Sequence, residues 1–143
     1  MSSLKKYELE EAAVLHLKDG GDDLMYADGA DGQPDPAKPM RVHLYGPGTK
    51  QYAKAQNARQ NHQVDLIKRK GRTRETAEEA AMENAEFLAA CTKSMENMET
   101  ESGATGHDLF IEVYANRRLY FIAAQVGLFL NDTANFTQGS RKP

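Results

Sequence analysis

The residues that could do chemistry in this sequence are four histidines, one cysteine and several loops rich in glycine or aspartate. His16, His43, His62 and His107 lie far apart in the chain, with no H-x-x-x-H pair and no cysteine close by. A zinc site needs histidine and cysteine ligands at short, regular spacings, and no serine has the context of a hydrolase nucleophile. The sequence therefore predicts no catalytic residue, no metal ligand and no cofactor.

Two loops invite a ligand-binding interpretation. The run GPGTK (46–50) suggests phosphate binding, but its glycines lack the G-x-x-x-x-G-K spacing and Thr49 precedes Lys50. Asp28, Asp31 and Asp35 suggest calcium, but the helix-loop-helix type of calcium site needs alternate carboxylates and a final glutamate. We interpret the first run as a turn before a helix capped by Thr49. We interpret residues 27–39, which are rich in Asp, Gly and Pro, as an exposed loop.

Charge is strongly segregated along the chain. Residues 1–36 and 75–143 each carry a net charge of −6, whereas residues 37–74 carry +9. The basic run at 68–74, which contains Lys68, Arg69 and Lys70, could contact nucleic acid. It lacks interleaved aromatic residues for base stacking, so the favoured interpretation is that the basic segment packs beside the acidic helix that follows it. Nucleic acid is thus the less favoured partner.

The single Cys91 cannot form an internal disulfide and indicates a small core residue in a reducing compartment. No signal peptide is recognisable, and no apolar run approaches the ~18 residues of a membrane span. We therefore expect a cytosolic protein without a membrane partner.

The N-terminal part has the pattern of a small antiparallel β-sheet. Residues 13–18 and 24–26 are β-prone runs separated by the turn sequence DGGDD, which predicts a hairpin. Residues 41–45 alternate as in a half-buried strand, with Val42 and Leu44 on one face. Every predicted strand precedes Thr49.

Two long helices are predicted next, joined by a short link that favours an antiparallel pair. The first covers residues 50–69, has Tyr52, Ala55 and Val64 as its apolar positions, and ends at Gly71. The second covers residues 76–98 and begins with a capping box of Thr76 and Glu79. Its apolar face follows the helical period, and its acidic residues are expected to face outward. These positions are, in order, Ala77, Ala81, Ala85, Leu88, Cys91 and Met95, then Glu78, Glu79, Glu83 and Glu86.

The C-terminal part is the most apolar. Leu109, Phe110, Val113 and Tyr114 predict a short helix from residue 107, and the run 116–118 (NRR) separates it from a longer one. In that longer helix Ile122, Val126 and Phe129 share the face expected to point inward. Residues 131–136 end it, and residues 137–143 are expected to fray.

The predicted fold class is α+β: a small N-terminal antiparallel β-sheet followed by an αα-hairpin and C-terminal helices. At this length one domain is expected over residues 1–143. Its predicted parts are a β-rich part (1–48), a helical hairpin (49–98), C-terminal helices (107–136) and a tail (137–143).

Two segments, YGPGTKQY (45–52) and AAQVGLFLNDTANF (123–136), resemble the tail assembly chaperones of long-tailed bacteriophages and prophages. The resemblance extends over roughly residues 15–136. It implies a non-enzymatic protein of the host cytoplasm that binds the tape measure protein, shields it from aggregation and helps to recruit tail tube subunits. It also makes weak homo-oligomerisation plausible.

Such a protein would act through a surface. The first candidates for contacts with a client or a second copy are large apolar residues of the last helix, although the same residues could equally form the core. They are Tyr120, Phe121, Leu128 and Phe129. The alternative functions are a structural tail or connector protein and a nucleic-acid-binding protein acting through residues 68–74.

Overall fold

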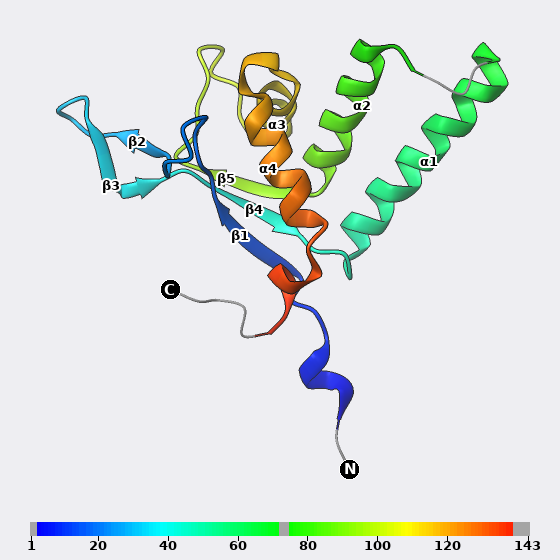
Figure 1. Cartoon of the computed structure of the whole chain (residues 1–143), viewed down its shortest axis with the longest axis horizontal. Helices are drawn as coiled ribbons and strands as arrows, with labels where there is room; N and C mark the ends of the chain where they lie inside the picture. The colour runs from blue at the N-terminus through cyan, green and yellow to red at the C-terminus, as the bar shows by residue number, and fades with distance from the viewer. Residues whose placement is uncertain (1–2, 72–74, 139–143) are drawn as a thin grey trace.

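The computed structural model describes residues 3–71 and 75–138, and it confirms an α+β fold. Its centre is an antiparallel sheet in the order β1 (Ala12–His16), β4 (Arg41–Tyr45) and β5 (Thr92–Glu96). The helices lie on one side of this sheet (Figure 1). Strand β4 has the predicted alternation, because Val42 and Leu44 are fully buried whereas their neighbours are at least partly exposed.

Strand β5 corrects the prediction that all strands precede Thr49. The helix expected over residues 76–98 ends as α2 (Ala77–Ala90), Cys91 caps it, and the chain then forms β5. Strand β5 pairs with the free edge of β4, with Met95 opposite Val42 and Thr92 opposite Leu44. The gain of ladder hydrogen bonds and of a buried position for Thr92 outweighs the helical spacing of these residues.

The predicted N-terminal hairpin is only partly formed. Strand β1 pairs with β4 and not with residues 24–26, and Lys18 and Leu24 form an isolated antiparallel bridge. The turn itself is as expected, because a carboxylate oxygen of Asp19 accepts the backbone N–H groups of Gly21 and Asp23.

The exposed loop predicted over residues 27–39 is instead a second, two-stranded sheet. Strands β2 (Tyr26–Asp28) and β3 (Pro34–Pro39) are antiparallel and project from the body as a hairpin (Figure 1). Its turn has a backbone hydrogen bond from Gly29 to Gln33 and a positive φ of 77° at Gly32, a conformation that suits glycine. The prediction of a loop was wrong because it depended on the prolines. An edge strand tolerates proline, since the missing N–H group is not needed on the unpaired side of the strand.

Helix α1 (Lys50–Lys70) is capped by Thr49 and ends at Gly71, whose φ is 62°. It runs antiparallel to α2, whose capping box of Thr76 and Glu79 is formed as predicted (Figure 1). Ala55 is buried, but Val64 is 47% exposed and Leu66 is buried instead. Nine residues at 100° per residue place Val64 opposite Ala55, whereas eleven residues return Leu66 to the same face.

The C-terminal helices pack on the inner side of the sheet. They are α3 (Gly106–Ala115) and α4 (Tyr120–Leu130), separated by the 3-10 helix η2 (Arg117–Leu119) and followed by η3 (Thr133–Phe136). The four apolar residues predicted for α3 are all buried, and the side chain of Asn116 caps η2. These helices, with α2 and β4, supply most of the core.

Phe136 anchors the end of the chain to the start of α1. It is fully buried, and its ring lies so close to Gly46 that a Cβ atom there would come within 2.6 Å of it. Its carbonyl oxygen accepts the N–H of Glu10, and earlier in the chain, on α4, the Gln125 side chain bonds both backbone groups of Lys18. The residues just before and just after strand β1 are thereby tied to the C-terminal part of the chain.

Candidate protein-binding surface

Two of the four predicted surface residues are mostly exposed to solvent. Tyr120 and Leu128 on α4 are 72% and 74% exposed. The buried stripe of the helix is Ile122, Val126 and Leu130, at steps of four residues. Tyr120 is two residues from Ile122, and Leu128 is two residues from both Val126 and Leu130. Two residues correspond to about 200° around the helix, so both side chains face outward.

Tyr120 and Leu128 border a shallow groove between α2 and α4 with a volume of about 440 Å³. Its floor is made largely of small side chains, which let the backbones of the two helices form a smooth surface. The described residues that line it are Ala81, Asn84, Tyr114, Asn116, Tyr120, Ala123, Ala124, Gly127, Leu128 and Asn131. None of these ten is charged, although charged residues make up 27% of the chain. The groove is therefore suited to an apolar or neutral protein segment.

Phe121 and Phe129 have a different environment. Both are half-buried and pack against the core. Phe129 makes an edge-to-face contact with Phe136, with ring centroids 5.6 Å apart. Phe129 thus stands partly inward, as its position with Ile122 and Val126 predicted, and neither phenylalanine is among the residues that line the groove. Leu130, which was not in the predicted inward set, is the fully buried member at this end.

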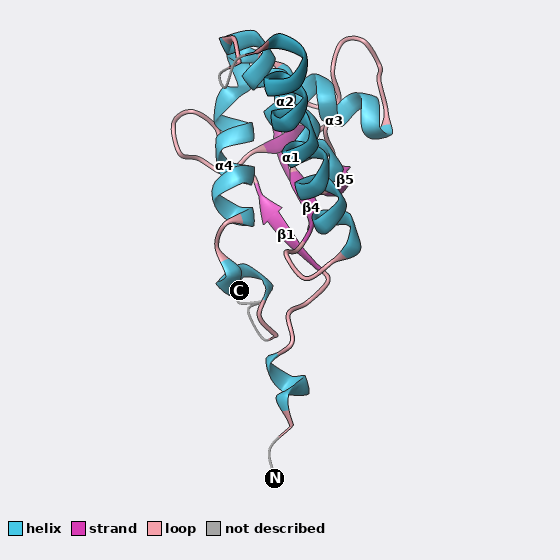
Figure 2. Cartoon of the chain, turned by 90° about the vertical axis from the view of Figure 1, so that its right-hand side faces the viewer, coloured by secondary structure: helices cyan, strands magenta, loops and turns pink. Residues whose placement is uncertain are grey.

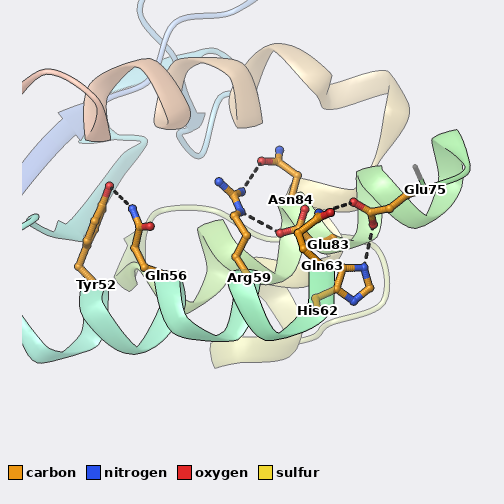
Figure 3. Close-up of polar contacts among 8 residues, drawn as sticks. All are labelled: Tyr52, Gln56, Arg59, His62, Gln63, Glu75, Glu83 and Asn84. Atoms are coloured by element: carbon orange, nitrogen blue, oxygen red, sulfur yellow. Dashed lines mark hydrogen bonds and ion pairs between the residues drawn. The ribbon is translucent and has the colours of Figure 1, made fainter. Parts of the chain in front are cut away.

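A second groove lies on the other side of α2, against α1, with a volume of about 410 Å³. Polar side chains from the two helices point toward one another across it (Figure 3). Arg59 donates from Nε to Glu83 at 2.8 Å and also contacts Asn84, while its guanidinium group lies over the Phe87 ring at 3.8 Å. We refer to this groove as the α1–α2 cleft. Glu83, expected to face outward, instead holds α1 to α2.

Further bridges continue along the α1–α2 cleft. The imidazole of His62 lies 2.8 Å from a carboxylate oxygen of Glu75, and Gln63 donates to the other oxygen at 3.0 Å (Figure 3). Nearer the start of α1, Gln56 donates to the hydroxyl of Tyr52, whose ring packs edge-to-face on Phe87. These contacts agree with the interpretation that the basic middle of the chain packs beside the acidic helix.

The residues with possible chemistry remain separate in space. His43 pairs with Glu96 on the sheet, His16 contacts the carbonyl oxygen of Met25, and His62 bonds Glu75. Within residues 3–71 and 75–138, no group of three or more His, Cys, Asp or Glu side chains is placed to hold a metal ion.

Cys91 and Tyr114 are buried and titrate abnormally. Burial raises the pKa of the Cys91 thiol to about 12. Burial likewise raises the pKa of the Tyr114 hydroxyl, which shares a 2.7 Å hydrogen bond with the hydroxyl of Thr92. Both groups are therefore neutral at physiological pH, and the thiol has little nucleophilic character.

The basic run at 68–74 is only partly covered by the structure. Lys68 and Arg69 lie exposed near the end of α1, and Arg69 pairs with Asp65 at 3.7 Å. Residues 72–74 and the side chain of Lys70, which belong to the predicted cluster, lie outside the described part of the structure.

The sequence analysis selected Tyr120 and Leu128, which are exposed, but did not include the small residues that line the groove between them. The floor of the groove combines Ala123, Ala124 and Gly127 from α4 with Ala81 from α2. The spacing of Ala124 and Leu128, with Gly127 beside them, was a signal for a close-packing surface. Ala81 lines the groove only because α2 and α4 cross at this point, and the spacing of residues in the sequence does not predict where two helices cross.

No protein-family model, no curated protein and no solved structure matches this chain. Among the described helices, none has the length and apolar character needed to cross a membrane.

Proposed function

We propose that this protein is a phage tail assembly chaperone that binds the tape measure protein, helps to recruit tail tube subunits and acts without catalysis in the host cytoplasm. The observation that carries the proposal is the uncharged groove between α2 and α4, with Tyr120 and Leu128 exposed at its border. Large exposed apolar side chains around a concave surface are typical of protein-binding sites. A long helical client that would otherwise aggregate is the partner that such a surface suits.

The sequence resemblance and the groove support the proposal together. The segment at 123–136 contributes five lining residues, namely Ala123, Ala124, Gly127, Leu128 and Asn131. The other resembling segment, at 45–52, forms the turn into α1 and contacts the first through Gly46 and Phe136. The two segments that suggest the family are therefore one packed unit, and that unit borders the groove.

The test is co-expression of the tagged protein with the neighbouring tail genes, followed by pull-down and identification of the bound proteins. We expect capture of the tape measure protein, with a loss of about tenfold or more in affinity for Tyr120→Asp and Leu128→Asp. Ile67→Asp is the matched control, because Ile67 is 55% exposed but lies on α1 away from the groove. Normal capture by both groove variants would overturn the assignment of the surface.

A second measurement separates a chaperone from a structural tail or connector protein. A chaperone leaves the assembled tail, so mass spectrometry of purified virions should not detect this protein. Its presence there in stoichiometric amounts with the tube subunits would overturn the chaperone proposal in favour of a structural role.

A further inference from the structure

The N-terminal segment forms a short arm with an apolar side. Residues 4–7 make the 3-10 helix η1 (Leu4–Tyr7), which extends beyond the rest of the molecule (Figures 1 and 2). A 3-10 helix has three residues per turn, so Leu4 and Tyr7 share one side while Lys5 and Lys6 flank it. Leu4 is 79% exposed and Tyr7 is 68% exposed. Both large side chains are therefore mostly exposed, although the Lys6 ammonium lies 5.1 Å from the centre of the Tyr7 ring.

The arm is held in a defined direction. The side-chain amide of Gln138 donates to the carbonyl oxygens of Lys5 at 3.1 Å and Glu8 at 2.9 Å. The backbone N–H of Glu10 donates to Phe136. In Figure 1, η1 lies at the opposite end of the molecule from the end of α1 and the start of α2. The arm of a chain therefore points away from the α1–α2 cleft of the same chain.

The α1–α2 cleft has the complementary character. Its apolar surface comes from Ala55, Ala58, Met82, Phe87 and Ala90, of which Met82 is 44% exposed. The carboxylates that line it are those of Glu79, which caps α2, Glu83, which is paired with Arg59, and Glu86. His62 and His107 also line the cleft. The cleft is thus an apolar hollow with an acidic border. The groove between α2 and α4, in contrast, offers no charge to two lysines.

We propose that the N-terminal arm of one copy binds in the α1–α2 cleft of a second copy. Leu4 and Tyr7 would cover Met82 and the neighbouring alanines, and Lys5 and Lys6 would lie near the carboxylate of Glu86. Because the donor and acceptor surfaces differ, the contact is heterologous and propagates head to tail into rings or open chains. The inference goes beyond client binding and does not require a client.

The test uses two variants that each remove one half of the contact. The arm variant is Leu4→Asp with Tyr7→Asp, and the cleft variant is Met82→Lys with Glu86→Lys; all four positions are exposed. Sedimentation velocity over a concentration series should show self-association of the unmodified chain, weakened about tenfold or more in each variant. Val14→Asp, at a 49% exposed position on the sheet, is the control and should associate normally.

Mixing the two variants gives the most specific outcome. The cleft variant retains a normal arm and the arm variant retains a normal cleft, so an equimolar mixture should form complexes of two chains and nothing larger. A mixture that stays monomeric, an arm variant that still associates, or an unmodified chain that stays monomeric at high concentration would each overturn the proposal. Thermal melting verifies that both variants are folded.

A charge exchange provides a check that leaves the apolar contacts intact. Lys5→Glu with Lys6→Glu should weaken association, and combining this arm with Glu86→Lys in a partner chain should restore part of it. The restored association should weaken as the salt concentration rises, because salt screens the attraction between exposed charges. Tape measure capture through Tyr120 and Leu128 is measured separately, so failure of the arm contact and failure of the proposed function are distinguishable.

Discussion

Helix α2 has a different neighbour on each of its two sides. Toward α3 and α4 it packs through apolar side chains, and those two helices supply seven residues to the buried core cluster. Toward α1 it is joined mainly by polar bridges, and among the described residues α1 supplies only Ala55 to that cluster. Figure 1 shows α2 between α1 on one side and α3 and α4 on the other.

The helices that border the two grooves are therefore held to α2 by interactions of different strength. Apolar burial stabilises by about 25 cal/mol per Å², whereas exposed ion pairs contribute about 0–1 kcal/mol each. The wall formed by α4 is therefore rigid, and the wall formed by α1 can shift at little cost. A preformed surface for a client is expected on the first wall, and an adaptable surface for a second copy is expected on the second.

The largest expected effect concerns the apolar side. Phe136→Ala removes a fully buried ring from between Gly46 and Phe129 and should lower the free energy of unfolding by about 3–5 kcal/mol. Urea denaturation measures it, with Tyr120→Ala as the control at an exposed position. A loss no greater than that of the control would show that η3 is not part of the core.

The second effect is a loss of stability at alkaline pH, because Cys91 and Tyr114 both lie on the apolar side. Their folded pKa values are raised above the ordinary values of 9.0 for cysteine and 10.0 for tyrosine, so the folded state holds both protons more tightly. Stability is then fully present below about pH 9 and falls as pH rises above it. Each group can remove up to about 1.4 kcal/mol per pH unit.

Urea denaturation at a series of pH values measures this slope. Tyr114→Phe and Cys91→Ala each lower stability at neutral pH, but each should also flatten the alkaline decline, which a purely structural effect would not do. An unchanged slope in both variants would assign the decline to other groups.

Much of this arrangement could be predicted from the sequence because it depends on local signals. The caps at Thr49, Thr76 and Gly71 and the alternation of Val42 and Leu44 are properties of neighbouring residues, and they are confirmed. The outward direction of Tyr120 and Leu128 follows from helical period in the same way. Local sequence patterns were sufficient to predict features that depend on a single helix or strand.

The errors arose where distant segments decide. Residues 92–96 continue a helical spacing, yet they pair with β4, about fifty residues earlier, because that strand has a free edge. The β2–β3 hairpin contains prolines that argue against a strand anywhere but at an edge. The groove between α2 and α4 likewise requires the crossing of two helices that sequence does not specify. Pairing between segments that are distant in the sequence leaves little signal in local residue patterns.

A smaller effect is expected on the polar side. Arg59→Gln breaks the bond to Glu83 and the contact with the Phe87 ring, but Arg59 is 36% exposed, so the loss should be about 1 kcal/mol. Hydrogen exchange should become faster in α1 and remain unchanged in α3 and α4. Lys68→Gln, at an exposed position beyond the cleft, is the control. Equally faster exchange in all helices would mean that α1 belongs to the same cooperative unit as the core.

The smallest effect on stability is expected in the groove proposed for the client. Tyr120→Asp and Leu128→Asp should each change the free energy of unfolding by about 0.5 kcal/mol or less, because both side chains are mostly exposed. Phe129→Asp on the same helix is the matched contrast, since it places a charge against Phe136 and should destabilise the fold strongly.

Thermal and urea denaturation of the three variants compare the two faces of α4 directly. If Tyr120→Asp and Leu128→Asp destabilise the chain as much as Phe129→Asp, the whole helix belongs to the core and the groove has no spare surface for a partner. If only Phe129→Asp is destabilising, the exposed residues contribute little to folding. Their large apolar side chains then require another reason, and binding a client protein supplies it.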